Sequence, residues 1–184
     1  RFPDGKPKGR TTRKPTMHNV MPLMNLVFNH EGYLWNGLVS NDNPNPKQRT
    51  IEDIVRMAII ADDEMCGTEA SAVAAIKADS KYPPLFKKAF GTEEITMERI
   101  QKAIAQCVRS LIAGNSKFDR YLQGKEQLTP QELHGYVLFT TEEGADCFHC
   151  HGSAGSPLFT TNLFYNNGLD AQPTDTHDRA SITG

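Results

Sequence analysis

Two cysteines and a histidine in the C-terminal third of the chain have a spacing that could attach a cofactor. Cys147-Phe148-His149-Cys150-His151 reads C-x-x-C-H. At this spacing two thiols form thioether bonds with the vinyl groups of a haem, and the adjacent histidine reaches the iron. The sequence therefore predicts covalent haem c on Cys147 and Cys150, with His151 as an axial iron ligand. His149 is expected to be a variable position inside the motif.

Other uses of paired cysteines fit this sequence less well. A structural zinc site needs a second pair of ligands, and Cys66 and Cys107 are too far apart to form a second C-x-x-C. A thioredoxin-like redox pair belongs in a βαβ unit, and no such pattern surrounds this motif. For Cys66 and Cys107 we favour two separate buried thiols, with a disulfide as the alternative in an oxidising compartment.

An acidic run is the second feature that could do chemistry. Asp62, Asp63 and Glu64 follow a helix predicted over residues 50–61, for which Thr50 is the expected N-cap. Carboxylates at the C-terminal end of a helix oppose its dipole, and local rules are broken mostly where function requires it. This run is therefore a candidate site, with a simple chain turn as the alternative.

Further helices should position these residues. Apolar residues recur every three or four positions over 97–113, a stripe that includes Cys107. Thr129, Pro130 and Glu132 form a capping box and first turn at the start of a helix over about 130–141, directly before the haem motif. Strand signals are poor, so the predicted fold class is mainly α.

The remaining segments are predicted as follows: a helix over 68–78, a stop at 82–84, a short amphipathic turn or helix over 85–90, loops over 1–22 and 41–49, and no regular structure in the last fifteen residues. The basic residues of the 1–22 loop are either solvated or face haem propionates or an acidic partner. Residues 23–35 are expected to lie buried beside a cofactor, where the single tryptophan, Trp35, would ordinarily fill the core.

Composition excludes several classes of protein. The 184 residues are 38% hydrophobic and 23% charged, as in soluble globular proteins, and the net charge of -2 gives no reason to expect a nucleic-acid or membrane partner. No apolar run approaches the roughly 20 residues of a membrane helix. Because covalent haem attachment normally takes place outside the cytoplasm, we expect a removed signal sequence and a periplasmic protein.

Several blocks of sequence, in the same order, resemble the bacterial di-haem cytochrome c peroxidases, including the branch that contains the methylamine-utilisation di-haem enzyme. The blocks are RFPDG at the start, N-x-x-P-L-x-N-x-x-F over 19–28, GYLWNG over 32–37, TIEDIVRMAIIADDEM over 50–65, IQKAIAQCVRSLIAGNSKFDRYL over 100–122, and the surroundings of the haem motif from LTPQELHGYVLF onward. The resemblance covers nearly the whole chain.

The resemblance implies cytochrome c-like haem domains, two in the full protein. Residues 1–95 would be the remainder of the N-terminal, peroxidatic domain without its own C-x-x-C-H. Residues 96–184 would be the C-terminal, electron-transfer domain, incomplete at its C-terminus. The chain would then be the middle piece of a larger protein, with one haem c here and a second expected in the rest.

The resemblance also implies roles for three further residues. Glu64 matches the family's catalytic distal glutamate, Trp35 the tryptophan that relays electrons between the haems, and Asn19 an asparagine that helps to hold an interdomain calcium. The sequence departs from the family at the distal glutamine, which is Ile54 here, and in FWDGR, whose aspartate and arginine are Asn36 and Leu38.

No histidine matches the removable distal ligand of the peroxidatic haem. Thr11 lies near that place, and His18 is an alternative ligand. His30, His134 and His177 are expected to be surface or packing residues. The sixth ligand of the haem at His151 is expected downstream of residue 184.

By this resemblance the protein reduces hydrogen peroxide to water with electrons from a small cytochrome c or copper protein, and a homodimer is left open. One alternative is an electron-transfer cytochrome without peroxidase activity. Another is a di-haem oxidase of a different organic substrate.

Overall fold

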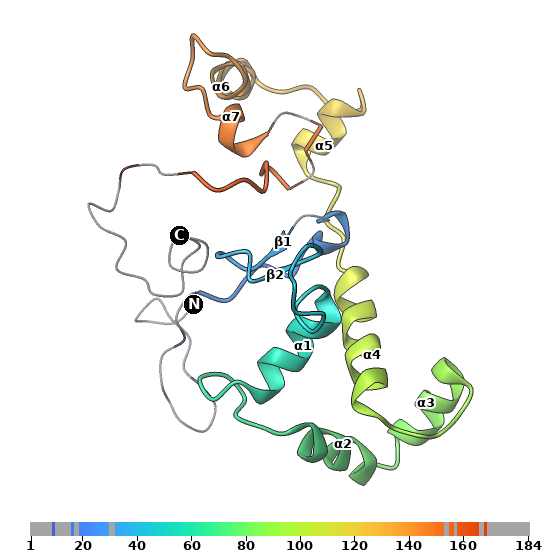
Figure 1. Ribbon diagram of the computed structural model, residues 1–184. Coiled ribbons are helices and arrows are strands. Elements are labelled where there is room, and N and C mark those ends of the chain that lie inside the picture. The colour runs from blue at the N-terminus through green and yellow to red at the C-terminus, as the bar shows by residue number, and fades with distance from the viewer. Residues whose placement is uncertain are drawn as a thin grey trace.

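The computed structural model describes residues 9, 16, 19–29, 32–152, 155–156, 158–165 and 168 (Figure 1). These residues form a 3-10 helix, η1, a two-stranded ribbon and seven α-helices, so the mainly α class is confirmed. Several predictions lie outside the described residues: most of the basic loop over 1–22, Thr11, His18, His30, His177 and the polar last fifteen residues.

The elements follow one another along the chain in this order: η1 Leu26–Phe28, β1 Gly32–Tyr33, β2 Val39–Ser40, α1 Ile51–Ile60, α2 Glu69–Ala78, α3 Tyr82–Phe90, α4 Met97–Arg109, α5 Lys117–Leu122, α6 Pro130–Thr140 and α7 Phe148–His151. In Figure 1, α1 to α4 lie together at one end of the molecule, and α5 to α7 lie at the other. None of the described helices is long and apolar enough to cross a bilayer.

Helix α1 begins as predicted, because Thr50 accepts a hydrogen bond from the Asp53 amide while the Asp53 carboxylate accepts one from the Thr50 amide. It packs along α4, and the core between them contains Leu26, Ile51 and Ala105. This core joins residues that are far apart in the sequence: one from η1, one from the start of α1 and one from the middle of α4.

Helices α2 and α3 form a second core with the N-terminal end of α4. Phe86 of α3 is buried there with Ile95 and Ile100. The helix predicted over 68–78 is confirmed as α2, which ends at Ala78, and the residues predicted as its stop, 82–84, also begin α3. The two prolines occupy its first turn, where a missing N–H group costs no helical hydrogen bond.

Helix α4 ends at Arg109, four residues before the predicted end. The chain then turns, and the Leu111 amide donates a hydrogen bond to the Val108 carbonyl. Leu111 and Ala113 form hydrogen bonds with Asn25 instead of continuing the helix. Helix α5 was not predicted, although its capping box, Ser116 with Asp119, is visible in the sequence.

The ribbon is short and antiparallel, pairing Gly32 with Ser40 and Tyr33 with Val39. Two-residue strands are too short to produce an alternating pattern, which explains why the sequence does not predict them. Trp35 lies in the connection between the strands and is 81% exposed, so the expectation that it fills the core is wrong. The predicted loop over 41–49 is confirmed as turns and bends.

Residues 23–35 are less buried than expected. Leu26 is 7% exposed, but Leu23, Met24 and Phe28 are each more than 40% exposed. The apolar run therefore buries Leu26 in the core described above, packs Tyr33 against that core, and presents several other side chains to the surface.

Candidate haem-attachment site

Helix α7 is a single helical turn that brings the three motif residues together. The His151 amide donates to the Cys147 carbonyl over 3.0 Å, which places the first cysteine and the histidine one turn apart. Both thiols are free, with Cys147 half-buried and Cys150 exposed. The residues predicted for haem attachment thus lie on one small surface.

The imidazole of His151 is oriented by a carbonyl. Its Nδ1 lies 3.2 Å from the Phe159 carbonyl oxygen, and an N–H at this position donates to that oxygen. The tautomer is then fixed with its lone pair on Nε2, the nitrogen left to bind a metal. The Phe139 ring, with its centroid 6.3 Å from that of the imidazole, packs beside it. Metal-binding histidines commonly make such a hydrogen bond with the ring nitrogen that does not bind the metal.

Apolar side chains surround the motif at the surface. Helix α6 buries none of its residues and exposes Leu133, Val137 and Leu138. After α7, Phe159 and Leu163 are 45% and 67% exposed, and Phe164 is 50% exposed. The donor set and these apolar neighbours fit a covalently attached haem, whose macrocycle is broad and apolar.

A hollow of about 480 Å³ lies next to the motif. Aromatic residues form much of its lining, namely Phe118 of α5, Tyr136 and Phe139 of α6, and Phe159. Their rings pack against one another, with centroids 5.2 Å apart for Phe118 and Tyr136 and 6.1 Å apart for Phe139 and Phe159. The three aromatic residues of α5 and α6 could not be predicted as part of the site, because their spacing from the haem motif in the sequence follows no known pattern.

His149 has a specific partner, although its position was expected to be variable. Its Nδ1 lies 2.6 Å from an Asp146 carboxylate oxygen, and its ring stacks on that of Phe148. Tyr165 donates a hydrogen bond to the His149 carbonyl over 3.2 Å. His134 is exposed on α6, in agreement with its expected surface role. Within the described part of the chain, no three histidine, cysteine, aspartate or glutamate residues form a further metal cluster.

The acidic run forms a tight turn at the end of α1. The amides of Met65 and Gly67 donate hydrogen bonds to carbonyls in the last turn of α1. The Cys66 amide donates to the carbonyl of Ala61, the C-cap residue of α1. Glu64 is exposed, yet partial burial and the neighbouring Asp63 raise the pKa of its carboxyl above the usual value. A chain turn, the simpler alternative, is therefore present, and it carries a carboxyl that holds its proton more tightly than usual.

The other residues singled out by resemblance lie on separate segments. Asn19 is exposed before η1, Trp35 is exposed between β1 and β2, and Glu64 follows α1. Each lies on a different element from the haem motif at α7.

Cys66 and Cys107 are both free, as favoured, but both are exposed, so the expected burial is wrong. Cys107 is not among the buried residues of α4, of which Ile100 and Ala105 enter the two cores. Cys66 lies in the turn after α1, with a backbone φ of 52°. Neither thiol therefore replaces an apolar core side chain.

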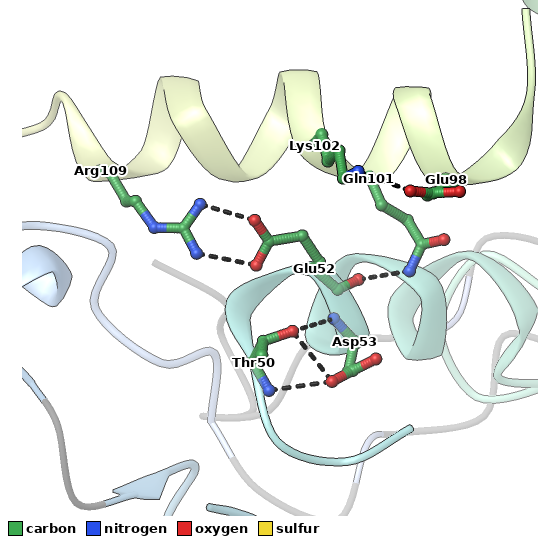
Figure 2. A network of polar contacts seen from close by, with 7 residues as sticks. All are labelled: Thr50, Glu52, Asp53, Glu98, Gln101, Lys102 and Arg109. Carbon is green, nitrogen blue, oxygen red and sulfur yellow. Dashed lines mark hydrogen bonds and ion pairs between the residues drawn. The ribbon is translucent and has the colours of Figure 1, made fainter. Parts of the chain in front are cut away.

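A polar network fixes α1 against α4 (Figure 2). The Arg109 guanidinium donates two hydrogen bonds of 2.7 Å to the Glu52 carboxylate, and the Gln101 side-chain amide donates to the Glu52 carbonyl over 2.8 Å. The hydrogen bonds from Arg109 hold the pKa of Glu52 below its usual value. Sequence reasoning missed this network because its partners are 57 and 49 residues apart.

Comparison with known proteins shows the family of the chain. The model of the family described as di-haem cytochrome c peroxidase matches residues 1–127. The chain is 42% identical over 89 residues to cytochrome c551 peroxidase from Nitrosomonas europaea, covering 48% of this chain and 26% of that protein. It is 32% identical over 159 residues to methylamine utilization protein MauG from Methylorubrum extorquens, covering 85% of this chain and 41% of that protein.

A solved structure has the same fold. It is a MauG-like protein associated with microbial copper homeostasis, with a TM-score of 0.76 and 29% sequence identity, over 97% of this chain and 54% of that one. The chain thus spans about half of this structure and between 26% and 41% of the two curated relatives named above.

Proposed function

Because the chain belongs to the di-haem cytochrome c peroxidase family, we propose that it is part of a periplasmic enzyme that reduces hydrogen peroxide to water. The single observation that supports this best is the orientation of His151, whose ring nitrogen faces the Phe159 carbonyl and leaves the other nitrogen for iron. The electrons would come from a small cytochrome c or copper protein.

In this proposal the chain binds one haem c and the full protein a second. Cys147 and Cys150 hold the haem of this chain through thioethers, and His151 binds its iron. When bound, the haem supplies storage and transfer of single electrons. Residues 96–184 form the electron-transfer domain, and residues 1–95 belong to the peroxidatic domain.

Glu64 is the proposed catalytic proton carrier. A carboxyl that moves a proton between the two oxygens of peroxide works best with a pKa raised toward the working pH. The raised pKa of Glu64, caused by partial burial and by Asp63, supports this role. Trp35 is the proposed electron relay between the haems, and Asn19 a proposed calcium ligand; the exposure of both on this chain leaves them accessible to such groups.

The test is Glu64→Gln in the full-length protein, with Glu93→Gln as the control, because Glu93 is an exposed glutamate outside the proposed site. We expect Glu64→Gln to lower peroxide turnover by about a hundredfold or more, the contribution of a positioned acid–base group. The absorption spectrum of the haems should not change. Turnover that survives in Glu64→Gln would remove Glu64 from the mechanism.

A second candidate is oxidation of a different organic substrate. It is favoured by the match to MauG proteins, one of which aligns with 85% of this chain. Peroxide consumption with reduced cytochrome c as electron donor separates the two enzymes, because only the peroxidase turns over with these two substrates alone. A pyridine haemochrome spectrum with the protein mass gives the haem count, and a single haem would favour a simple electron-transfer cytochrome.

A further inference from the structure

Asn25 makes three hydrogen bonds to a segment far away in the sequence. Its backbone amide donates to the Leu111 carbonyl over 2.8 Å. Its side-chain amide donates to the Ala113 carbonyl over 3.0 Å, and its side-chain oxygen accepts from the Ala113 amide over 2.7 Å. One side chain thus pairs with both polar groups of Ala113, as a neighbouring strand would.

The two sides of this contact belong to different parts of the molecule. Asn25 directly precedes η1, whose Leu26 is buried in the core with Ile51 of α1 and Ala105 of α4. Ala113 lies in the short connection that leaves α4 and enters α5. Asn25 and Ala113 also line the hollow together with Phe159, whose carbonyl orients His151. The contact therefore lies between the α1–α4 core and the haem-attachment site.

Asparagine suits this position for two reasons. The residue has φ 64° and ψ 13°, in the left-handed region that asparagine tolerates better than most residues with a side chain. Its amide also carries a donor and an acceptor side by side, and a carboxylate would lack the donor for the Ala113 carbonyl.

We propose that Asn25 is a positioning residue that fixes the α4–α5 connection and thereby the placement of the haem segment relative to the α1–α4 core. This inference rests on the proposed di-haem function for its consequence: electron transfer between the two haems depends on that placement. In this proposal Asn25 acts through the backbone of Leu111 and Ala113, to which it is hydrogen-bonded.

The decisive variant is Asn25→Gly in the full-length haem protein. Glycine adopts positive φ without strain and keeps the backbone bond to Leu111, so only the side-chain pair with Ala113 is lost. Asn43→Gly is the matched control. The Asn43 side chain also donates to one backbone carbonyl, that of Leu38, and accepts from one amide, that of Asn45, but within its own loop.

Two measurements distinguish positioning from a general loss of stability. Hydrogen exchange at the Ala113 amide should become about two- to tenfold faster in Asn25→Gly, the effect of losing one such hydrogen bond, and should be unchanged in Asn43→Gly. The rate of electron transfer between the haems in half-reduced protein should fall, while both midpoint potentials stay at their wild-type values.

Each outcome bears on the proposal. Unchanged exchange over residues 111–116 in Asn25→Gly would overturn it, and so would faster exchange with an unchanged rate of electron transfer. If haem counting finds a single haem, the di-haem function fails. Faster exchange that spreads from Ala113 to α5 and residues 158–165 would then support the positioning role, and faster exchange confined to residues 111–116 would refute it.

Discussion

Arg109→Gln removes both hydrogen bonds that join α4 to the Glu52 carboxylate on α1 (Figure 2). The side chains of this pair are 31% and 24% exposed for Arg109 and Glu52. An ion pair in full solvent contributes at most about 1 kcal/mol, and breaking a fully buried pair costs about 3–5 kcal/mol. A two-point, half-buried pair should lie between these limits, so we expect Arg109→Gln to lower the free energy of unfolding by about 2 kcal/mol.

For a protein of this size, that loss corresponds to a melting temperature lower by about 4–8 °C. The assay is thermal unfolding followed by circular dichroism, on Arg109→Gln, Glu52→Gln and the double variant. The two single changes should be markedly non-additive, because each removes the same pair. Glu98→Gln is the control, since Glu98 pairs with Lys102 on the same helix but is exposed. Its melting temperature should stay close to wild type.

The stability that the Glu52–Arg109 pair contributes should depend on pH. The pKa of Glu52 is lower in the folded protein than its ordinary value of 4.5, so its contribution to stability is complete above that value. The contribution is lost as the pH falls through the lowered pKa of the folded state. The difference in stability between wild type and Glu52→Gln should therefore shrink below pH 4.5. A melting temperature of Arg109→Gln no lower than that of Glu98→Gln would refute this reasoning.

Two further changes test the surroundings of the proposed site. A Cβ on Gly144 would lie 2.5 Å from the Leu138 carbonyl oxygen, so Gly144→Ala should lower the yield of covalently bound haem on a haem-stained gel. Gly114→Ala, where no atom lies within 4 Å of the added Cβ, should not. Asp63→Asn should lower the pKa of Glu64, because Asp63 helps to raise it. The acid limb of the pH profile of peroxide turnover should then move to lower pH, and an unmoved limb would contradict the role of Glu64.

The parts of the fold that the sequence predicted are those whose signals are local. Thr50 and Thr129 each form the predicted cap within one turn of the helix that follows, so α1 and α6 begin where expected. The C-x-x-C-H spacing is equally local, and α7 with its N-cap residue Cys147 brings the two thiols and the imidazole together. The prolines at 83 and 84 were expected only to follow the end of a helix, but proline also suits the first turn of a helix, and α3 begins there.

The contacts that the sequence did not predict join distant segments. Asn25 meets Ala113 across 88 residues, and Glu52 meets Arg109 across 57. Periodicity reports which face of a helix is apolar but not which segment will cover it. The same limit explains Cys107, which belongs to the apolar stripe of α4 and yet is exposed, since neither core reaches that side of the helix.

The long separation between Asn25 and Ala113 has a consequence for the order of folding. A loop of 88 residues must close before this contact forms, and closure costs chain entropy before any contact offsets it. This contact should therefore form slowly compared with the helix caps, whose partners lie within a few residues of one another. Cys147 and Cys150 would then be accessible for the proposed haem attachment before the contact between Asn25 and Ala113 has formed.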